Sequence, residues 1–127
     1  MALILDTNAL SGVADGEAGA VEEFAKARQV AIPVIVLGEY RFGIALSRRR
    51  SEYERWLADA LGICEVLEVG EATSTQYAEL RLELKLAGTP IPTNDLWIAA
   101  LCRQHALPIL SRDRHFDLVK GVRRVSW

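Results

Sequence analysis

Residues 2–8 carry the sequence Ala2-Leu3-Ile4-Leu5-Asp6-Thr7-Asn8, an unbroken apolar run that ends in an acid and two polar residues. A strand of a parallel sheet has this continuous apolar character, because helices cover both of its faces. The run therefore predicts a buried parallel strand over residues 2–5, with Asp6 at its carboxyl end. Functional sites of open α/β sheets lie at that end of the strands.

Short apolar runs alternate with longer helical patterns along the rest of the chain. Further strands are predicted at residues 30–32, 63–69, 108–111 and 122–127, and helices at residues 7–14, 17–28, 34–48, 51–61, 73–87 and 95–105. Pro33 is expected to open the third helix, Ser51 to cap the fourth, and Thr93 or Asn94 to cap the last. This alternation predicts an α/β sandwich around a mainly parallel sheet of four to five short strands.

The composition is that of one globular domain, with 127 residues of which 50% are hydrophobic and 25% charged. A chain of this length buries roughly two-thirds of the surface that its unfolded form exposes, so it needs neither a disulfide framework nor a structural metal. Cys64 and Cys102 are therefore expected to be reduced thiols. No linker or repeat interrupts the pattern, and a single domain over residues 1–127 is predicted.

The charge balance limits the partners that the chain can bind. Fifteen Lys and Arg residues against seventeen Asp and Glu residues give a net charge of -2. This balance excludes a general basic coat for binding phosphates, so any contact with nucleic acid must be local. The longest apolar stretch, residues 30–38, is far shorter than the ~20 residues of a membrane span, and no signal peptide is evident. A cytoplasmic protein with no membrane contact is expected.

Two acids follow the ends of predicted strands. Asp6 ends the first strand, and Asp113 lies just past the strand at residues 108–111. Because the carboxyl ends of parallel strands meet at one edge of a sheet, both carboxylates are expected at the same edge.

Two further acids stand among apolar residues at helical spacing. Glu39 shares a helical face with Ile35, Phe42 and Leu46, so its carboxylate is expected to point inward. Asp95 repeats the pattern at the start of the last predicted helix. Four acids, Asp6, Glu39, Asp95 and Asp113, are therefore candidates for one site.

Taken singly, each of these acids has a structural explanation. Asp6 and Asp95 could stabilise helix N-termini, Asp113 could be a turn residue, and Glu39 could pair with Arg81. Four carboxylates in one place would repel one another and lose hydration, so such a cluster is expected to hold a cation. Oxygen ligands suit Mg²⁺ or Mn²⁺, whereas zinc would need His and Cys residues at spacings that this chain lacks.

Charged residues also flank the candidate site. Arg112 and Arg114 stand on either side of Asp113 and are candidate contacts for an RNA phosphate, with a solvated surface as the alternative. Asp117 is a candidate additional acid, with surface exposure as the alternative.

Four stretches stand in order along the chain: LILDTN at residues 3–8, IPVIVLGE at residues 32–39 with Gly43 after it, TNDLWIAA at residues 93–100, and SRDRHF at residues 111–116. Together they resemble the PIN-domain ribonucleases, and within them the VapC-type toxins of prokaryotic toxin–antitoxin pairs. Their order and spacing match over nearly the whole chain. The resemblance implies a PIN-like three-layer α/β/α sandwich.

The resemblance also implies an activity and its site. The four acids would bind Mg²⁺ or Mn²⁺, and Thr7, Asn8 and Ser111 would be polar neighbours that orient ligands or water. The implied reaction is endonucleolytic hydrolysis of RNA by metal-activated water. The implied partners are a cognate VapB-type antitoxin and further copies of the toxin, in a homodimer or a higher assembly.

Two other functional classes stay open. A catalytically silent PIN-like module that binds RNA or protein is disfavoured, because it has little reason to keep all four acids. A small phosphatase-like phosphohydrolase would also place an acid after the first strand, but Asp6-Thr7-Asn8 lacks the second acid expected two residues later. Metal-dependent cleavage of RNA would distinguish the ribonuclease from the silent module. Hydrolysis of a small phosphomonoester would indicate the phosphohydrolase.

Overall fold

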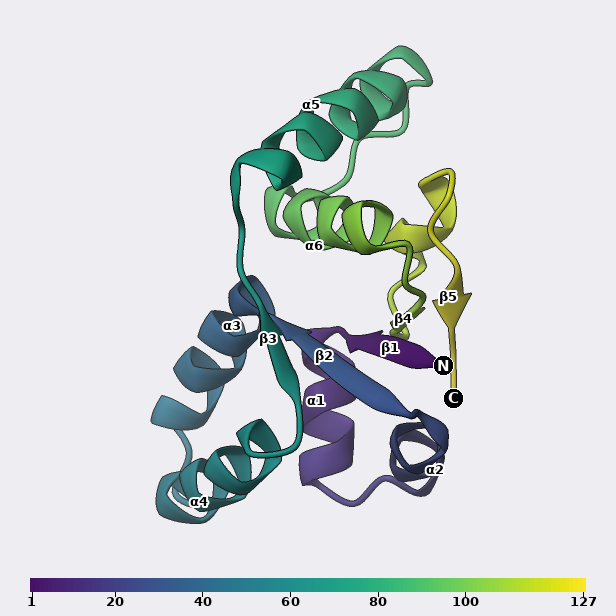
Figure 1. Cartoon of the computed structure of the whole chain (residues 1–127). Coiled ribbons are helices and arrows are strands. Elements are labelled where there is room, and N and C mark those ends of the chain that lie inside the picture. Colours follow the sequence, from purple (N-terminus) through teal and green to yellow (C-terminus); the bar gives the residue numbers. More distant parts are fainter.

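Five parallel strands form one sheet in the order β3-β2-β1-β4-β5 (Figure 1). The computed structural model describes residues 1–127. The strands are short: β1 Ala2–Leu5, β2 Gln29–Pro33, β3 Glu65–Leu67, β4 Ile109–Leu110 and β5 Arg124–Val125. The prediction of a parallel α/β sheet is confirmed. Because β1 has β2 on one side and β4 on the other, the strand order reverses at β1, where such sheets form a crevice.

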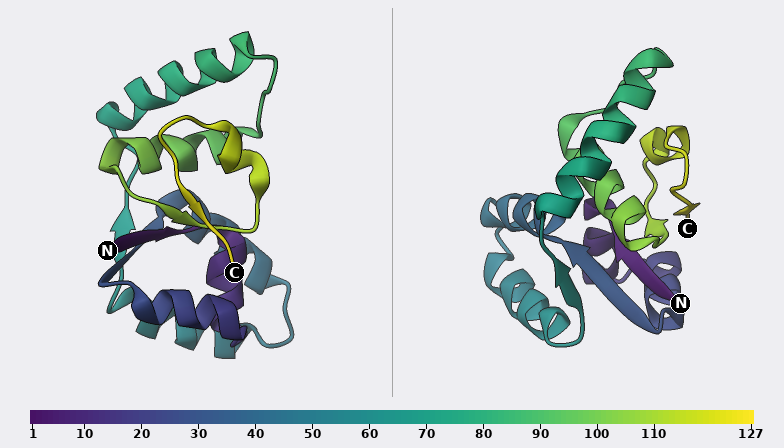
Figure 2. Two further views of the ribbon diagram at one scale, coloured as in Figure 1. Left: turned by 90° about the vertical axis from the view of Figure 1, so that its right-hand side faces the viewer. Right: turned by 45° about the horizontal axis from the view of Figure 1, so that its top comes forward.

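Helices cover both faces of this sheet (Figure 2). They are α1 Thr7–Ala14, α2 Ala18–Lys26, α3 Val34–Ala45, α4 Arg50–Leu61, α5 Glu71–Leu86 and α6 Thr93–His105, followed by the 3₁₀ turn η1 Arg114–Leu118. Helices α1, α2 and α4 lie on one face, and α5 and α6 lie on the other. Helix α3 contacts α1, α4 and α6, so it connects the two helical layers. None of the helices combines the length and apolar character needed to cross a bilayer.

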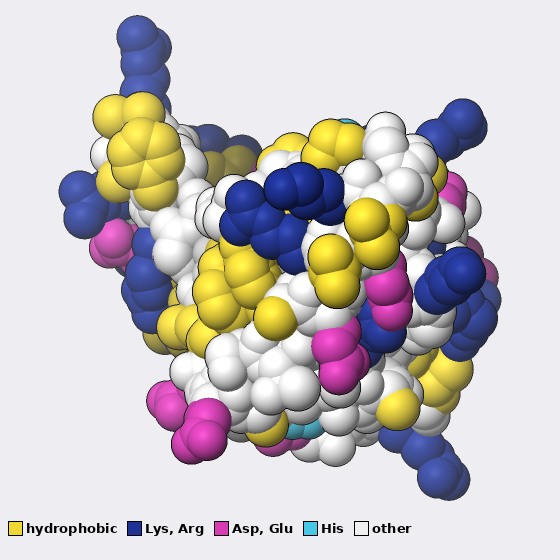
Figure 3. Space-filling view, turned by 90° about the horizontal axis from the view of Figure 1, so that it is seen from above, with side chains coloured by type: hydrophobic (Ala, Val, Ile, Leu, Met, Phe, Trp, Pro, Cys, Tyr) yellow, Lys and Arg dark blue, Asp and Glu magenta, His cyan; other side chains and the backbone are white.

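Helix α5 forms the outermost layer on its side and packs along α6. Tyr77 of α5 stacks on Trp97 of α6 with the ring centroids 4.0 Å apart. The outer side of α5 exposes Leu82 and Leu86, and Figure 3 shows hydrophobic and basic side chains sharing this end of the molecule. An exposed surface of this kind is available for contact with another chain.

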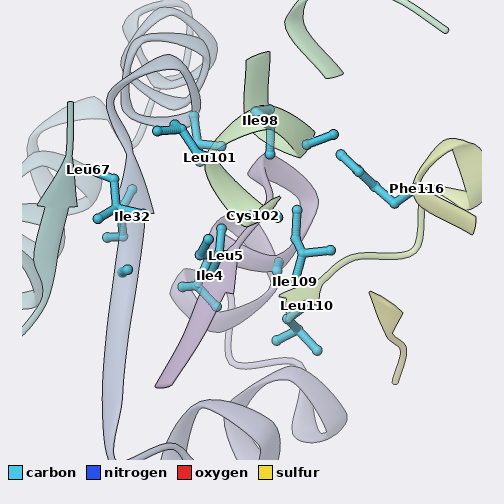
Figure 4. Close-up of a cluster of buried hydrophobic side chains, with 14 of the residues drawn as sticks. Ile4, Leu5, Ile32, Leu67, Ile98, Leu101, Cys102, Ile109, Leu110 and Phe116 are labelled. Carbon is cyan, nitrogen blue, oxygen red and sulfur yellow. The ribbon is translucent and has the colours of Figure 1, made fainter. Parts of the chain in front are cut away.

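Figure 4 shows the part of the core that lies between the central strands and α6. Ile4 and Leu5 of β1 and Ile109 of β4 are completely buried, as are Leu101 and Cys102 of α6. Two neighbouring residues of one strand point to opposite faces. Burial of both Ile4 and Leu5 therefore shows that both faces of β1 are covered, as its unbroken apolar run predicts. Cys102 and Cys64 are free thiols.

Two predicted helix caps are wrong. Ser51 lies inside the first turn of α4, and the Ser47 hydroxyl oxygen instead accepts a hydrogen bond from the Arg49 backbone N–H. Thr93 and Asn94 are the first residues of α6 rather than its caps, because Pro92 occupies the cap position. Proline fixes its own φ at a value that is compatible with the start of a helix, and α6 begins here without a side-chain capping hydrogen bond. The Asn94 side chain is thereby left for another contact.

Candidate active site

Asp6 and Asp113 leave the sheet at the same edge. In the register of β1 and β4, Leu5 pairs with Leu110, so the next residues, Asp6 and Ser111, stand side by side. The Asp6 carboxylate accepts the backbone N–H of Thr7 at 2.8 Å and begins α1, and the Asp113 carboxylate accepts the backbone N–H of His115 at 2.9 Å. Both acids thus also have the structural role of a cap, and each accepts its capping hydrogen bond with one of its two carboxylate oxygens.

Short polar side chains fix the Asp6 carboxylate. Its Oδ2 accepts hydrogen bonds from the Ser111 hydroxyl at 2.6 Å and from the Asn8 amide at 3.2 Å. The Ser111 oxygen in turn accepts the Asp113 backbone N–H at 2.9 Å, and Asn8 Oδ1 accepts the Arg112 backbone N–H at 3.1 Å. These bonds connect the end of β1 to the segment after β4, so the two acids are held by one network.

Burial raises the pKa of Asp6, which is only 5% exposed. The hydrogen bonds from Ser111 and Thr7 oppose this shift, whereas the negative charges of Asp113 and Glu39 add to it. A carboxylate in this setting lacks a neutralising partner. A bound cation would supply one.

Asp95, in the first turn of α6, faces Asp113 and His115. The Nδ1 atom of His115 lies 2.8 Å from Asp95 Oδ2 and 3.0 Å from Asp113 Oδ1. One ligand atom of each of the three residues lies within 4.8 Å of the others, close enough to share a metal ion. Burial raises the pKa of Asp95 to about 6, and the nearby charges of Asp113 and Asp6 add to this shift.

Glu39 lies at the exposed rim of this cluster, so the prediction that it points inward is wrong. Phe42 and Leu46, which were expected to share its buried face, are 71% and 80% exposed. Helix α3 is apolar on nearly every side, so spacing alone does not identify its inner face. The buried residues are Val36 and Tyr40, with Ile44 one turn further on.

Two hydrogen bonds nevertheless hold the Glu39 carboxylate at the site. Its Oε1 accepts the Thr7 hydroxyl at 2.8 Å, and its Oε2 accepts the Asn94 amide at 3.4 Å. Because Thr7 follows Asp6 directly and Asn94 precedes Asp95, both neighbours bring Glu39 toward those acids. The four acids thus lie around one edge of the sheet, with Glu39 as the outermost.

His115 is the site residue that the sequence pattern did not identify. The hydrogen bond to Asp95 raises the pKa of His115, and the charge of Asp113 adds to this shift, whereas partial burial of the ring opposes it. The available signal was its position two residues after Asp113. An aspartate that accepts the backbone N–H of the second residue after it forms a local turn, which brings that residue close to the carboxylate.

The flanking charged residues have partners outside the cluster. Arg112 bonds Glu17 at 2.8 Å and stacks over the Trp127 ring at 4.5 Å. Asp117 is exposed and bonds Arg124 at 2.9 Å, which lowers the pKa of Asp117. The Asp117 charge is therefore balanced by Arg124 rather than directed toward the four acids.

Arg114 is exposed beside Asp113. Arg112 and Arg114 both follow β4 next to the acid cluster, which places positive charge close to it. Contact with an RNA phosphate stays a prediction for both residues.

The raised pKa values predict how the stability of the metal-free protein depends on pH. The native state binds the Asp95 proton up to about pH 6, whereas the ordinary pKa of an aspartate, which the unfolded chain retains, is 3.8. The native state thus holds more protons in this window, and the Asp95 contribution to the free energy of unfolding falls as pH rises through it. The raised pKa of His115 acts in the same direction, because its contribution is complete below pH 6.5 and is lost above.

Thermal unfolding in EDTA between pH 5 and 8 measures this effect. The Asp95→Asn protein is expected to lose less stability than the wild type as pH rises, since it lacks the titrating carboxylate and its bond to His115. Equal pH profiles for the two proteins would contradict the assignment.

Comparison with known proteins agrees with this architecture. Residues 3–122 match the family model of the PIN domain. Among curated proteins, Ribonuclease VapC5 of Mycobacterium tuberculosis is 29% identical over 125 residues, covering 97% of this chain and 91% of that protein. Ribonuclease VapC4 of the same organism is 33% identical over 102 residues, covering 75% of each chain.

A solved structure extends the similarity to three dimensions. The structure of VapBC2 from Rickettsia felis bound to a DNA fragment from their promoter contains a chain that matches with a TM-score of 0.87 and 25% identity. The match covers 100% of this chain and 99% of that one. The parallel sheet, the acids at its edge and these matches lead to one conclusion: the chain belongs to the PIN-domain family, and within it to the VapC proteins.

Proposed function

We propose that this protein is the toxin of a VapBC-type toxin–antitoxin pair and acts as a metal-dependent endoribonuclease. The relatives named Ribonuclease VapC support the reaction class. The observation that carries the proposal is the placement of Asp6, Asp95 and Asp113 around one sheet edge, where burial raises the pKa of Asp6 and of Asp95. Acids held in this way favour a bound cation over mutual repulsion.

The donor set fits Mg²⁺ or Mn²⁺. Asp95 and Asp113 offer carboxylate oxygens within 4.8 Å of each other and of a His115 nitrogen, and Asp6 adjoins them through Ser111. Hard divalent ions prefer such oxygens, and Mn²⁺ also accepts an imidazole ligand. When bound, the ion supplies Lewis-acid activation of water and neutralises charge on the phosphate.

The residues of the chain position this chemistry. Ser111 and Asn8 hold Asp6 at a fixed orientation, and Thr7 with Asn94 holds Glu39 at the rim. Acids attached to strand ends and helix starts move little, which preserves the spacing that a metal site requires. No serine or cysteine nucleophile is needed for hydrolysis by this route.

A VapB-type antitoxin is the proposed partner, in a complex that also contains a second copy of the toxin or a higher assembly. The similar Rickettsia felis chain belongs to VapBC2, solved on DNA of its promoter. In this chain, Phe42 of α3, Leu46 directly after α3 and Leu86 of α5 are more than two-thirds exposed, which is unusual for large apolar residues of a monomer. A partner that covers them and offers a basic side chain to the acids would inhibit the enzyme.

The expected result for metal binding is a rise in melting temperature. An ion that binds only the native state stabilises it by about 2.7 kcal/mol at a concentration 100 times its Kd. Thermal scans of the wild type with increasing Mn²⁺ or Mg²⁺ measure this shift. The Asp113→Asn protein is the matched control and should show little shift; an equal shift in both proteins would place the ion elsewhere.

Cleavage assays test the activity itself. The isolated wild type should cut single-stranded RNA when Mn²⁺ or Mg²⁺ is present and lose activity in EDTA. RNA binding without cleavage would indicate the silent module, and hydrolysis of a small phosphomonoester would indicate the phosphohydrolase.

A further inference from the structure

A cavity of about 260 Å³ extends away from the acid cluster between α1 and α3. At the end next to the acids, the Thr7 hydroxyl donates to Glu39 at 2.8 Å. At the far end, the Tyr53 hydroxyl donates to Asp15 at 2.7 Å. The cavity is therefore continuous with the proposed active site, and Thr7 and Glu39 belong to both.

Tyr40 lines this cavity with a hydroxyl that has no hydrogen-bond partner. The residue is only 3% exposed, and its ring meets Trp56 edge-on at 6.2 Å between centroids. Burial raises the pKa of Tyr40 to about 12, and the charge of Asp15 adds to the shift, so the hydroxyl keeps its proton and lies near the Asp15 end. A buried donor without an acceptor is costly, and a ligand in the cavity could supply the acceptor.

The remaining lining restricts the charge of a ligand. Five of the nine lining residues carry a hydroxyl, two are acids at the ends, and none is Lys, Arg or His. A phosphate would be repelled by Asp15 and Glu39. The favoured ligand is an uncharged group that carries hydrogen-bond donors and an acceptor along one edge. The donors would bond the carboxylates of Asp15 and Glu39, and the acceptor would bond the Tyr40 hydroxyl.

We propose that the cavity binds one nucleobase beside the scissile phosphate and favours bases with an amino group over uracil, an inference that rests on the proposed ribonuclease function. Bases of single-stranded RNA can be splayed out and bound along their edges. An amino group donates to a carboxylate, as cytosine N4 does to Asp or Glu, whereas uracil presents two carbonyl oxygens around one N–H. The cavity is slightly smaller than the ~300–1,000 Å³ of sites for drug-sized ligands, which suits a single base.

A basic side chain is the competing occupant, and Tyr40 distinguishes the two. A guanidinium only donates hydrogen bonds, so it can bond the Tyr40 oxygen but leaves the Tyr40 proton without an acceptor. A nucleobase offers a ring nitrogen or a carbonyl oxygen in addition to its donors. The unpartnered hydroxyl therefore favours the base.

Two glycines of α3 provide a matched pair of variants. A Cβ added at Gly43 or at Gly38 would meet no atom within 4 Å, so both positions accept a longer side chain. Gly43 lines the cavity and Gly38 does not. Gly43→Gln should fill the cavity, whereas Gly38→Gln places the same side chain elsewhere on the same helix.

The first readout is the base preference of cleavage. Random oligoribonucleotides are cut with Mn²⁺ present and the new ends are sequenced. The wild type and Gly38→Gln should disfavour uracil at one position flanking the cut by about tenfold, as expected for one base contact. Gly43→Gln should reduce this preference to about twofold or less, and Tyr40→Phe should weaken it without lowering the melting temperature, because the hydroxyl has no partner to lose.

The second readout does not depend on cleavage. Asp6→Asn protein is titrated with fluorescent ten-residue oligoadenylate or oligouridylate, with and without Gly43→Gln. Oligoadenylate should bind at least about fivefold more tightly than oligouridylate, and Gly43→Gln should remove the difference.

The outcomes separate the two proposals. Equal affinities for the two oligomers, or an unchanged preference in Gly43→Gln, would overturn the base site. If the wild type cuts no RNA, the ribonuclease proposal fails, while the binding titration still decides the base site. If Gly43→Gln keeps the wild-type base profile but escapes inhibition by the antitoxin, the cavity binds the antitoxin and the base proposal is wrong.

Discussion

Replacing Asp6 with Asn is expected to lower RNA cleavage more than about 100-fold, because even the outer partners of a metal site contribute about 10–100-fold to metal affinity or activity. Asp6 is the most deeply buried of the four acids and joins the network of Ser111 and Asn8. Its amide replacement removes a negative charge at the centre of the proposed site. Single-turnover cleavage with Mn²⁺ measures the loss.

The same substitution should leave the fold intact. Asparagine is as good a helix cap as aspartate, so the backbone N–H of Thr7 keeps its acceptor. Removing one of several mutually repelling charges should raise the melting temperature of the metal-free protein. Asp59→Asn, on the exposed side of α4, makes the same change in net charge away from the site and should cut RNA at the wild-type rate. Cleavage of RNA by Asp6→Asn at the wild-type rate would contradict the assignment of Asp6 to the active site.

Replacing Leu5 with Ala is expected to cost about 2–5 kcal/mol of stability, the range for a leucine removed from a close-packed core. Leu5 is completely buried in β1, the middle strand of the sheet. The loss is a large part of the roughly 5–15 kcal/mol that separates folded from unfolded domains. Urea unfolding monitored by tryptophan fluorescence measures it.

Leu46→Ala is the control for this prediction. Leu46 is 80% exposed at the end of α3, so the same truncation should change the free energy of unfolding by about 0.5 kcal/mol or less. Similar losses for the two variants would show that burial in β1 does not determine the effect. Because Leu5 directly precedes Asp6, Leu5→Ala should also reduce metal binding as the fold loosens.

The sheet and two of the acids could be predicted because the signals are local. An unbroken apolar run identifies a doubly covered strand, and the residue after such a strand stands at the edge where sites form. Asp6 and Asp113 follow from this rule. The pairing of Leu5 with Leu110 then places Asp6 beside Ser111, two residues before Asp113.

The orientation of Glu39 could not be predicted in the same way. Helix α3 has apolar residues on nearly every side, and its inner face is set by contacts with α1, α4 and α6. Those contacts join segments far apart in the sequence. For the same reason, the cavity between α1 and α3 and its unpartnered Tyr40 hydroxyl become visible only in three dimensions.

The caps of α4 and α6 show a different limit. Ser51 and Thr93 belong to residue types that favour caps, yet each lies within a first helical turn. Arg49 and Pro92 occupy the two cap positions instead, and neither has a side-chain capping hydrogen bond. Cap preferences identify the neighbourhood of a helix start better than the residue itself.

The register between β1 and β4, in which Leu5 pairs with Leu110, restricts where the gene can gain or lose codons. One added residue in either strand would advance it by about 3.3 Å and turn every later side chain to the opposite face. Asp6 would then no longer meet Ser111. Insertions and deletions among homologous genes are accordingly expected in exposed connections such as residues 87–90, and not between Ala2 and Asp6.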